Sequence, residues 1–341
     1  MIQSHPSPNA EGTESMSGRM ACLAGEAVYG LRDKGSFAGE AIGRRQTPFG
    51  TSEVIFEIHG NGQPYYLLCP HGAHRYEVSA GFVNHRANLY ALKDLGVQTV
   101  VSFAAAGAIS HNYGIGDLVV AGDVIDRTTR RPTTFFENTG MGVLRQFPVF
   151  CPALREAMTD CLDEMNVKYH RKGTLVVSEG PRLETPAEIR FLAAAGGHLV
   201  GHSFVPEAFL AKELQMCYAG VAYVANYAET GSHQRPFSTA DLFGGLAAPD
   251  DAGRRARAVE TIGRLVERLS QVVPKAPAQC TCDQTMARQI EQFGLPEDFR
   301  LWFPPPPAGG AYEPTAPQGD RLAKPLAGRD LRQRGPMRRQ A

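Results

Sequence analysis

The feature that most constrains the fold is residues 173–212, which contain two strand–turn–helix units in succession. The first unit starts with the β-branched run 174–177, which is typical of a buried strand. A polar turn follows, and a helix over 187–195 is then predicted, with Thr185 as its N-cap. The second unit repeats this order from a short strand at 198–200. Ligands of open α/β sheets bind where such strands end, so we expect a site at these turns.

The two turns carry the side chains from which such a site is built. Glu179, Arg182 and Glu184 lie in the first turn, and His202 and Ser203 lie in the second. Because the carboxyl ends of parallel strands meet at one edge of a sheet, we expect these five residues to lie near one another.

The rest of the chain also alternates between strand and helix patterns. Strands are predicted at 21–24, 98–103 and 217–224, a hairpin of two strands at 53–58 and 65–69, and helices at 83–92, 152–166 and 256–273. This alternation predicts an α/β fold with a mixed, twisted central sheet flanked by helices.

Composition changes sharply at both ends of the chain. We expect a disordered lead over residues 1–18, one domain over 19–275, a C-terminal extension over 276–303, and a disordered, Pro/Gly-rich basic tail over 304–341. The tail is expected to be solvated and to bind no nucleic acid.

The overall composition excludes several classes of protein. The formal net charge of the 341 residues is zero, which gives no reason to expect nucleic acid or an anionic membrane as a partner. No apolar run approaches the roughly 20 residues that span a bilayer. Seven scattered cysteines suit reduced thiols, and no secretory signal is visible, so we expect a cytoplasmic protein.

Two groups of residues resemble metal ligands but are too few. Cys280 and Cys282 form a Cys-x-Cys pair, and two thiols alone do not make a zinc site. Cys69, His71 and His74 lie close in sequence but have no fourth ligand nearby. The sequence therefore predicts ordinary thiols, no metal and no cofactor.

Two motifs carry a family resemblance. Residues 179–185 read Glu-Gly-Pro-Arg-Leu-Glu-Thr, and residues 201–207 read Gly-His-Ser-Phe-Val-Pro-Glu. Together they resemble the trimeric purine nucleoside phosphorylase and methylthioadenosine phosphorylase family, over roughly residues 20–275. The resemblance implies a nucleoside phosphorylase-like fold, a homotrimer, and cleavage of the N-glycosidic bond of a purine nucleoside, with phosphate as the expected co-substrate.

The resemblance also implies a base-binding site. Asn226 occupies the place of the residue that reads the purine, where Asn suits 6-oxopurines by donating to N7 or O6. Glu184 matches an acid that accepts a hydrogen bond from N1–H; a helix N-terminal carboxylate is the simpler alternative. Leu183, Ala105 and Gly107 would line the base. We expect guanosine or inosine to be preferred over adenosine.

Ribose-binding and catalytic roles are assigned in the same way. His202 and Tyr76 are expected at the ribose, although His202 could equally be a satisfied pocket histidine. Asn226 and His71 are expected to act in catalysis. Glu26 joins them if water is the nucleophile, because it could position that water; otherwise it points to solvent.

The phosphate site departs from the family pattern at three places. The loop near Gly25 has lost its hydroxyl, Pro70 stands where an Arg is expected, and Ala104 stands near the place of a Thr. The side chains left to bind phosphate are Ser203, His71, His74 and Arg75. We therefore expect weak phosphate binding. A phosphate-independent hydrolase, a methylthionucleoside phosphorylase and a catalytically silent purine-binding homologue remain as alternatives.

Overall fold

The computed structural model describes residues 19–25, 27–137, 139–229, 250–273 and 280–305. The predicted disordered lead, nearly all of the predicted tail, and Glu26 lie outside these residues.

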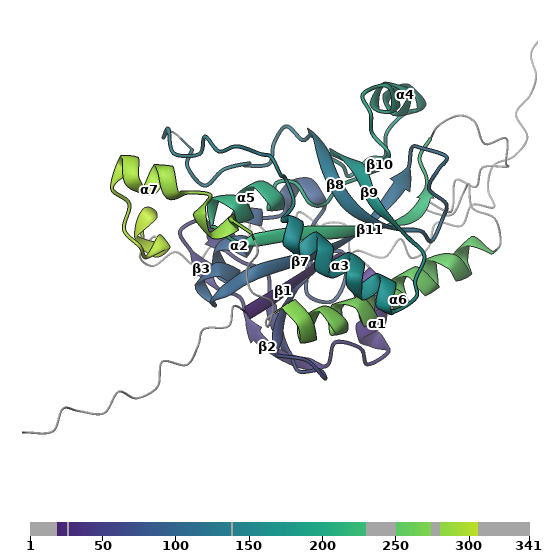
Figure 1. The fold of residues 1–341 in the computed structure, drawn as a ribbon, viewed down its shortest axis with the longest axis horizontal. Helices are drawn as coiled ribbons and strands as arrows, with labels where there is room; N and C mark the ends of the chain where they lie inside the picture. Colours follow the sequence, from purple (N-terminus) through teal and green to yellow (C-terminus); the bar gives the residue numbers. More distant parts are fainter. Residues whose placement is uncertain (1–18, 26, 138, 230–249, 274–279, 306–341) are drawn as a thin grey trace, which may run out of the picture.

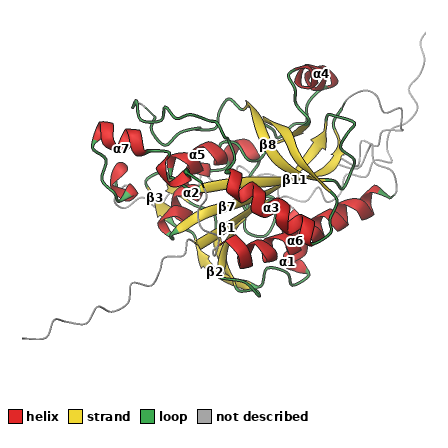
Figure 2. Ribbon diagram, in the orientation of Figure 1, coloured by secondary structure: helices red, strands yellow, loops and turns green. Residues whose placement is uncertain are grey.

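Within the described residues, nine strands form one sheet in the order β10-β9-β8-β11-β7-β1-β6-β5-β2 (Figure 2). The strands are β1 Arg19–Ala24, β2 Gly39–Gly43, β5 Ile55–Ile58, β6 Tyr65–Leu68, β7 Val97–Ala108, β8 Leu118–Arg127, β9 Tyr169–Ser178, β10 Leu199–Gly201 and β11 Cys217–Tyr227. Two short strands, β3 Gln46–Thr47 and β4 Gly50–Thr51, pair separately.

The sheet is mixed, as predicted, and one part of it closes on itself. Strands β6, β1, β7 and β11 are parallel neighbours, whereas β8 runs antiparallel to β11. Strands β8, β9 and β10 are parallel to one another, and β10 returns to pair antiparallel with β7. Strands β7, β11, β8, β9 and β10 therefore form a closed ring, in which β7 and β11 run in one direction and the other three run in the opposite direction.

Helices cover the sheet in two groups. Their bounds are α1 Ala27–Asp33, α2 His85–Asp94, α3 Pro152–Glu164, α4 Pro186–Ala194, α5 Glu207–Glu213, α6 Asp251–Val272 and α7 Ala287–Phe293, with 3-10 turns η1 Ala80–Phe82, η3 Cys282–Gln284 and η4 Phe299–Trp302. Helix α6 packs against α1 and α3, and α2 packs against α5 (Figure 1). No helix in the described ranges combines the length and apolar character needed to cross a bilayer.

Most predicted elements are present, with three differences that affect the site. Helix α1 begins at Ala27, inside the stretch predicted to be a loop. Strand β8 covers Leu118–Arg127, where no strand was predicted. Strand β7 continues five residues beyond its predicted end, so Ala105 and Gly107 lie within the strand.

The described part of the C-terminal extension packs against the domain. Phe299, Trp302 and Phe303 are buried. The ring of Phe303 lies 5.1 Å from that of Phe49 and 5.3 Å from that of Phe136, centroid to centroid. Figure 1 shows α7 (yellow-green) on the side of α5. Aromatic burial of this kind gives the extension an apolar anchor.

Candidate active site

The two polar turns meet beside the C-terminal part of β7. Because β9 and β10 are parallel, their turns leave the sheet at the same edge, as the sequence predicts. Val200 on β10 pairs antiparallel with Gly107, so the chain after Gly201 runs back along β7 toward Ala105. A Cβ added at Gly201 would lie 3.1 Å from the Ala105 carbonyl oxygen. The glycine thus lets the second turn approach the strand closely.

Glu184 is held in place by its two neighbours in the site. Its carboxylate accepts a hydrogen bond from the Ser178 hydroxyl, and its Oε1 lies 3.7 Å from Nε2 of His202. Burial alone would raise the pKa of Glu184, but His202 and Ser178 outweigh it and hold the pKa below its usual range. The side chain, 10% exposed, is therefore an anionic acceptor at neutral pH.

A β-bulge in β11 places Asn226 opposite Gly107 of β7. The register between β11 and β7 shifts between Val224 and Asn226, and Asn226 then pairs with Gly107. Its Nδ2 donates to the Tyr227 carbonyl at 3.1 Å. A Cβ at Gly107 would lie 3.5 Å from both Asn226 Oδ1 and a methyl of Val200. Asn226 therefore lies beside the strand pair that leads to His202.

The remaining predicted base contacts lie in the same region. Ala105 is exposed although its neighbours Ala104 and Ala106 on the central strand are buried. Leu183 is half-buried in the turn that carries Glu184. An exposed small residue within a central strand marks a part of the sheet that the described protein leaves uncovered.

His71 is buried and has a fixed orientation. Its Nδ1 lies 2.9 Å from the Val78 carbonyl oxygen, and its ring stacks on Tyr76 with centroids 4.5 Å apart. A carbonyl only accepts, so Nδ1 carries the proton and Nε2 is the acceptor nitrogen. Burial lowers the pKa of His71, which favours this neutral form.

The other three residues predicted to bind phosphate, Arg75, His74 and Ser203, do not all lie in one place. Arg75 is exposed and pairs with Glu77 at 3.3 Å. His74 is exposed, with its ring edge against Phe56. Ser203 is half-buried directly after His202. The geometry therefore groups Ser203 with the base-site turn, whereas His74 and Arg75 are engaged on the outer side of their loop.

Sequence reasoning missed Arg131, which joins the two turns. Its buried guanidinium donates to the Glu179 carboxylate at 3.1 Å and to the carbonyls of His202 and Val205, each at 2.7 Å. It also donates to the carbonyls of Ser178 and Glu179. No sequence signal identifies this residue, because its role depends on the path of the loop that carries it.

A buried acid network lies behind His71. Glu207, the last residue of the Val-Pro-Glu segment, accepts a hydrogen bond from Tyr218 at 2.5 Å and one from Ser102 at 3.3 Å. Its other oxygen lies 3.5 Å from Nδ1 of His85. The motif contains Glu207, but nothing in the sequence places its partners.

The prediction concerning Cys280 and Cys282 counted too few thiols. Within the described residues, the side chains close enough to share a metal ion are Cys151, Cys217, Cys280 and Cys282. The fold brings two further cysteines, distant in sequence, beside the Cys-x-Cys pair. Two thiols alone are too few for a zinc site, but the pair has two further thiols beside it that the sequence did not reveal.

Comparison with known proteins agrees with this geometry. The family model described as "Phosphorylase superfamily" matches residues 39–270. The 6-oxopurine nucleoside phosphorylase of Pyrococcus furiosus is 35% identical over 217 residues, covering 62% of this chain and 80% of that protein. The S-methyl-5'-thioadenosine phosphorylase of Saccharolobus solfataricus is 31% identical, covering 74% of this chain and 90% of that protein.

Solved structures share the fold. A methylthioadenosine phosphorylase from an Antarctic soil metagenomic library superimposes with a TM-score of 0.69 at 22% identity, covering 80% of this chain and 91% of that chain. The methylthioadenosine phosphorylase of Schistosoma mansoni, solved with tubercidin, gives a TM-score of 0.68 at 22% identity, covering 80% and 98%. The chain belongs to the phosphorylase superfamily, in the family of the purine nucleoside phosphorylases and methylthioadenosine phosphorylases.

Proposed function

We propose that this protein is a pentosyltransferase of the purine nucleoside phosphorylase type that cleaves the N-glycosidic bond of 6-oxopurine nucleosides. The observation that carries the proposal is the Glu184 carboxylate, a side chain only 10% exposed that lies beside His202 and Ser178, which together favour its ionised form. A 6-oxopurine has an N1–H that donates to such a carboxylate. Adenine has no N1–H, so Glu184 would be left without that partner, at a cost of about 1–3 kcal/mol.

Asn226 supplies the chemistry at the departing base. The bond breaks through an oxocarbenium-like sugar, and negative charge develops on the purine. The Asn226 amide donates to N7 or O6 and stabilises that charge in the transition state. Its present donation to the Tyr227 carbonyl is replaced when the base is bound. Leu183, Ala105 and Gly107 line the base, and His202 and Tyr76 bind the ribose.

We infer that phosphate is the acceptor and binds weakly. Arg75 is paired with Glu77 rather than free to bind an anion, and His74 lies against Phe56. His71 in its neutral form presents an acceptor nitrogen, which suits a protonated phosphate oxygen or a water better than a bare anionic oxygen. Ser203 is then the main side-chain donor. Each lost contact to a charged ligand weakens binding by about 1.5–3 kcal/mol.

One assay tests both the identity of the acceptor, phosphate or water, and the preference for the base. Purified protein is given inosine, guanosine, 5'-methylthioinosine or adenosine, and base release is measured against phosphate concentration. We expect the 6-oxopurine nucleosides to react faster than adenosine, with ribose 1-phosphates as products and no saturation at low-millimolar phosphate. Free ribose released at a phosphate-independent rate would instead identify a hydrolase. Absence of base release from all four would identify a silent homologue.

The proposed substrates include nucleosides with either a 5'-hydroxyl or a 5'-methylthio group. Relatives from Methanothermobacter thermautotrophicus and Methanopyrus kandleri, 36% and 35% identical, are named probable S-methyl-5'-thioinosine phosphorylases. 5'-Methylthioinosine and inosine share the 6-oxopurine that Glu184 and Asn226 would read. Faster reaction of 5'-methylthioinosine than of inosine would therefore refine the proposed function without changing the base preference.

We also propose a cytoplasmic homotrimer. Phe147, Val143 and Phe82 are 83%, 80% and 65% exposed, and large apolar side chains at such exposure favour a covering partner. None of the seven cysteines forms a disulfide, which suits a reducing compartment. Light scattering of the full chain should give three times the chain mass, and a monodisperse monomer would contradict the trimer.

A further inference from the structure

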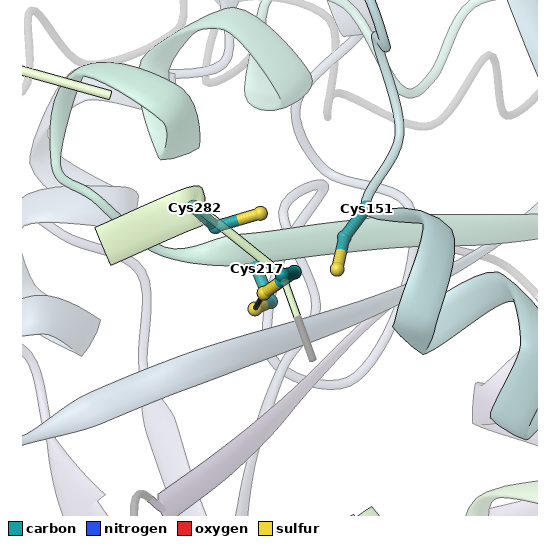
Figure 3. A group of neighbouring side chains, drawn as sticks. Cys151, Cys217 and Cys282 are labelled. Carbon is teal, nitrogen blue, oxygen red and sulfur yellow. Dashed lines mark hydrogen bonds between the residues drawn. The ribbon is translucent and has the colours of Figure 1, made fainter. Parts of the chain in front are cut away.

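Four cysteines from three separate segments converge at one point of the fold. The Sγ atoms of Cys151, Cys217, Cys280 and Cys282 all lie within 4.8 Å of one another. Those of Cys217 and Cys280 are 3.4 Å apart. Figure 3 shows Cys151, Cys217 and Cys282 directed toward a common centre from different elements. In a tetrahedral zinc–thiolate site with Zn–S near 2.3 Å, the sulfurs lie about 3.8 Å apart. We propose that these four cysteines bind one structural zinc ion.

The fold fixes these ligands before any metal binds. Cys151 is the N-cap of α3, and its amide donates to the Tyr218 carbonyl, one residue beyond Cys217, at 2.9 Å. Cys217 begins β11. Two of the four ligands therefore lie at a junction between a strand and a helix that a backbone hydrogen bond holds together.

The other two ligands arrive on the C-terminal extension. Cys282 begins the turn η3, and the Thr285 hydroxyl three residues later donates to the Lys212 carbonyl at 2.6 Å. The Gln215 side chain also donates to the Asp283 carbonyl. These bonds hold the extension against the end of α5, so the Cys-x-Cys pair faces the junction.

Positive charge lies where a tetrathiolate site needs it. Zinc with four thiolates has a net charge of minus two, and binding releases four thiol protons to water without any transfer of electrons. Lys93 interacts electrostatically with Cys217, and Lys212 interacts with Cys282. The Lys212 ammonium is held by the carbonyls of Arg145 and Pro148, at 3.3 and 2.6 Å.

The site is closed, as structural zinc sites are. Cys151 is buried and the other three cysteines are half-buried. Four protein ligands leave no open position for a substrate or water. The metal therefore joins the extension to the domain, and this function is independent of the acceptor or base that the active site uses.

Metal analysis of the purified full chain tests the proposal directly. We expect about one zinc per chain by elemental mass spectrometry and negligible iron. Modification of the thiols with a mercurial should release that zinc to a colorimetric chelator. Cobalt(II) exchanged into the site should give the visible and thiolate charge-transfer bands of a tetrahedral sulfur site.

Matched variants locate the metal. Cys282→Ser and Cys280→Ser should each lose most of the zinc, whereas Cys161→Ala, which removes a buried thiol elsewhere on α3, should retain it. The variants that lose zinc should also unfold at a temperature several degrees lower. Wild-type protein with no stoichiometric zinc would overturn the proposal, whether its four cysteines prove to be disulfides or the site holds iron. Zinc retained in Cys282→Ser would overturn it as well.

Discussion

Nε2 of His202 lies 3.7 Å from Oε1 of Glu184, so the residue expected at the ribose contacts the residue expected at the base. The two come from different turns, and Arg131 holds those turns together through carbonyls on both sides. Under the proposed function, we expect His202 to affect base recognition through the ionisation of Glu184.

Replacing His202 should move the acid limb of the pH–rate profile. Burial raises the pKa of Glu184, and His202 is the largest of the contributions that oppose it. In His202→Met that opposition is lost, so the pKa rises and the carboxylate is protonated at higher pH than in the wild type. The acid limb of kcat/KM for inosine should then shift to higher pH. His170→Met, which removes a histidine paired with Asp117 at another place, should leave it unmoved.

Asn226→Asp should weaken the preference for 6-oxopurines. An ionised Asp accepts but does not donate to N7 or O6, and a protonated Asp suits a 6-aminopurine. The ratio of kcat/KM for inosine to that for adenosine should fall by roughly 10- to 100-fold, corresponding to about 1–3 kcal/mol. Asn112→Asp, an exposed position, is the control. An unchanged ratio would remove Asn226 from the base site.

Arg131→Met should be far more damaging than Arg130→Met. Removing the Arg131 guanidinium leaves the Glu179 carboxylate and four carbonyls without their shared donor, and breaking such a buried pair costs about 3–5 kcal/mol. The neighbouring Arg130 is exposed over the Phe82 ring, and its loss should stay within about 0.5 kcal/mol. Urea denaturation of both variants measures the difference. Equal unfolding free energies for the two variants would contradict the conclusion that Arg131 holds the two turns together.

The fold was largely predictable because its signals are local. The capping box of Thr185 and Glu188 is present, and the predicted hairpin forms between β5 and β6. The closed ring was not predictable, because it depends on β10, a three-residue strand that pairs on both sides. Short apolar runs predict a strand but not its partners.

In the candidate site, too, some residues could be predicted from local sequence signals and others could not. Glu184 and Asn226, which we propose bind the base, each come after a predicted strand and were expected from their motifs. Arg131 could not, since a loop residue with no periodic pattern gives no sign of which carbonyls it will meet. The four cysteines are the clearest case: residues 151 and 282 are far apart in sequence, and only the packing of the extension places them together.

Glu213 should make stability fall as pH rises. It is buried, accepting bonds from the Thr134 hydroxyl and the Phe135 amide, and burial raises its pKa from 4.5 to about 7. Between these values the folded state holds a proton that the unfolded state has lost, so the unfolding free energy decreases with pH. The total decrease is roughly 3 kcal/mol, at 1.36 kcal/mol per pKa unit.

The difference in unfolding free energy between the wild type and Glu213→Gln isolates this effect. Measured by urea denaturation from pH 4.5 to 8, the wild type should lose stability relative to the variant as pH rises, and the difference should level off above pH 7. Glu156→Gln, at an exposed carboxyl on α3, should give a curve parallel to the wild type. If the Glu213→Gln curve is also parallel, the carboxyl is ionised throughout and its two hydrogen bonds outweigh its burial.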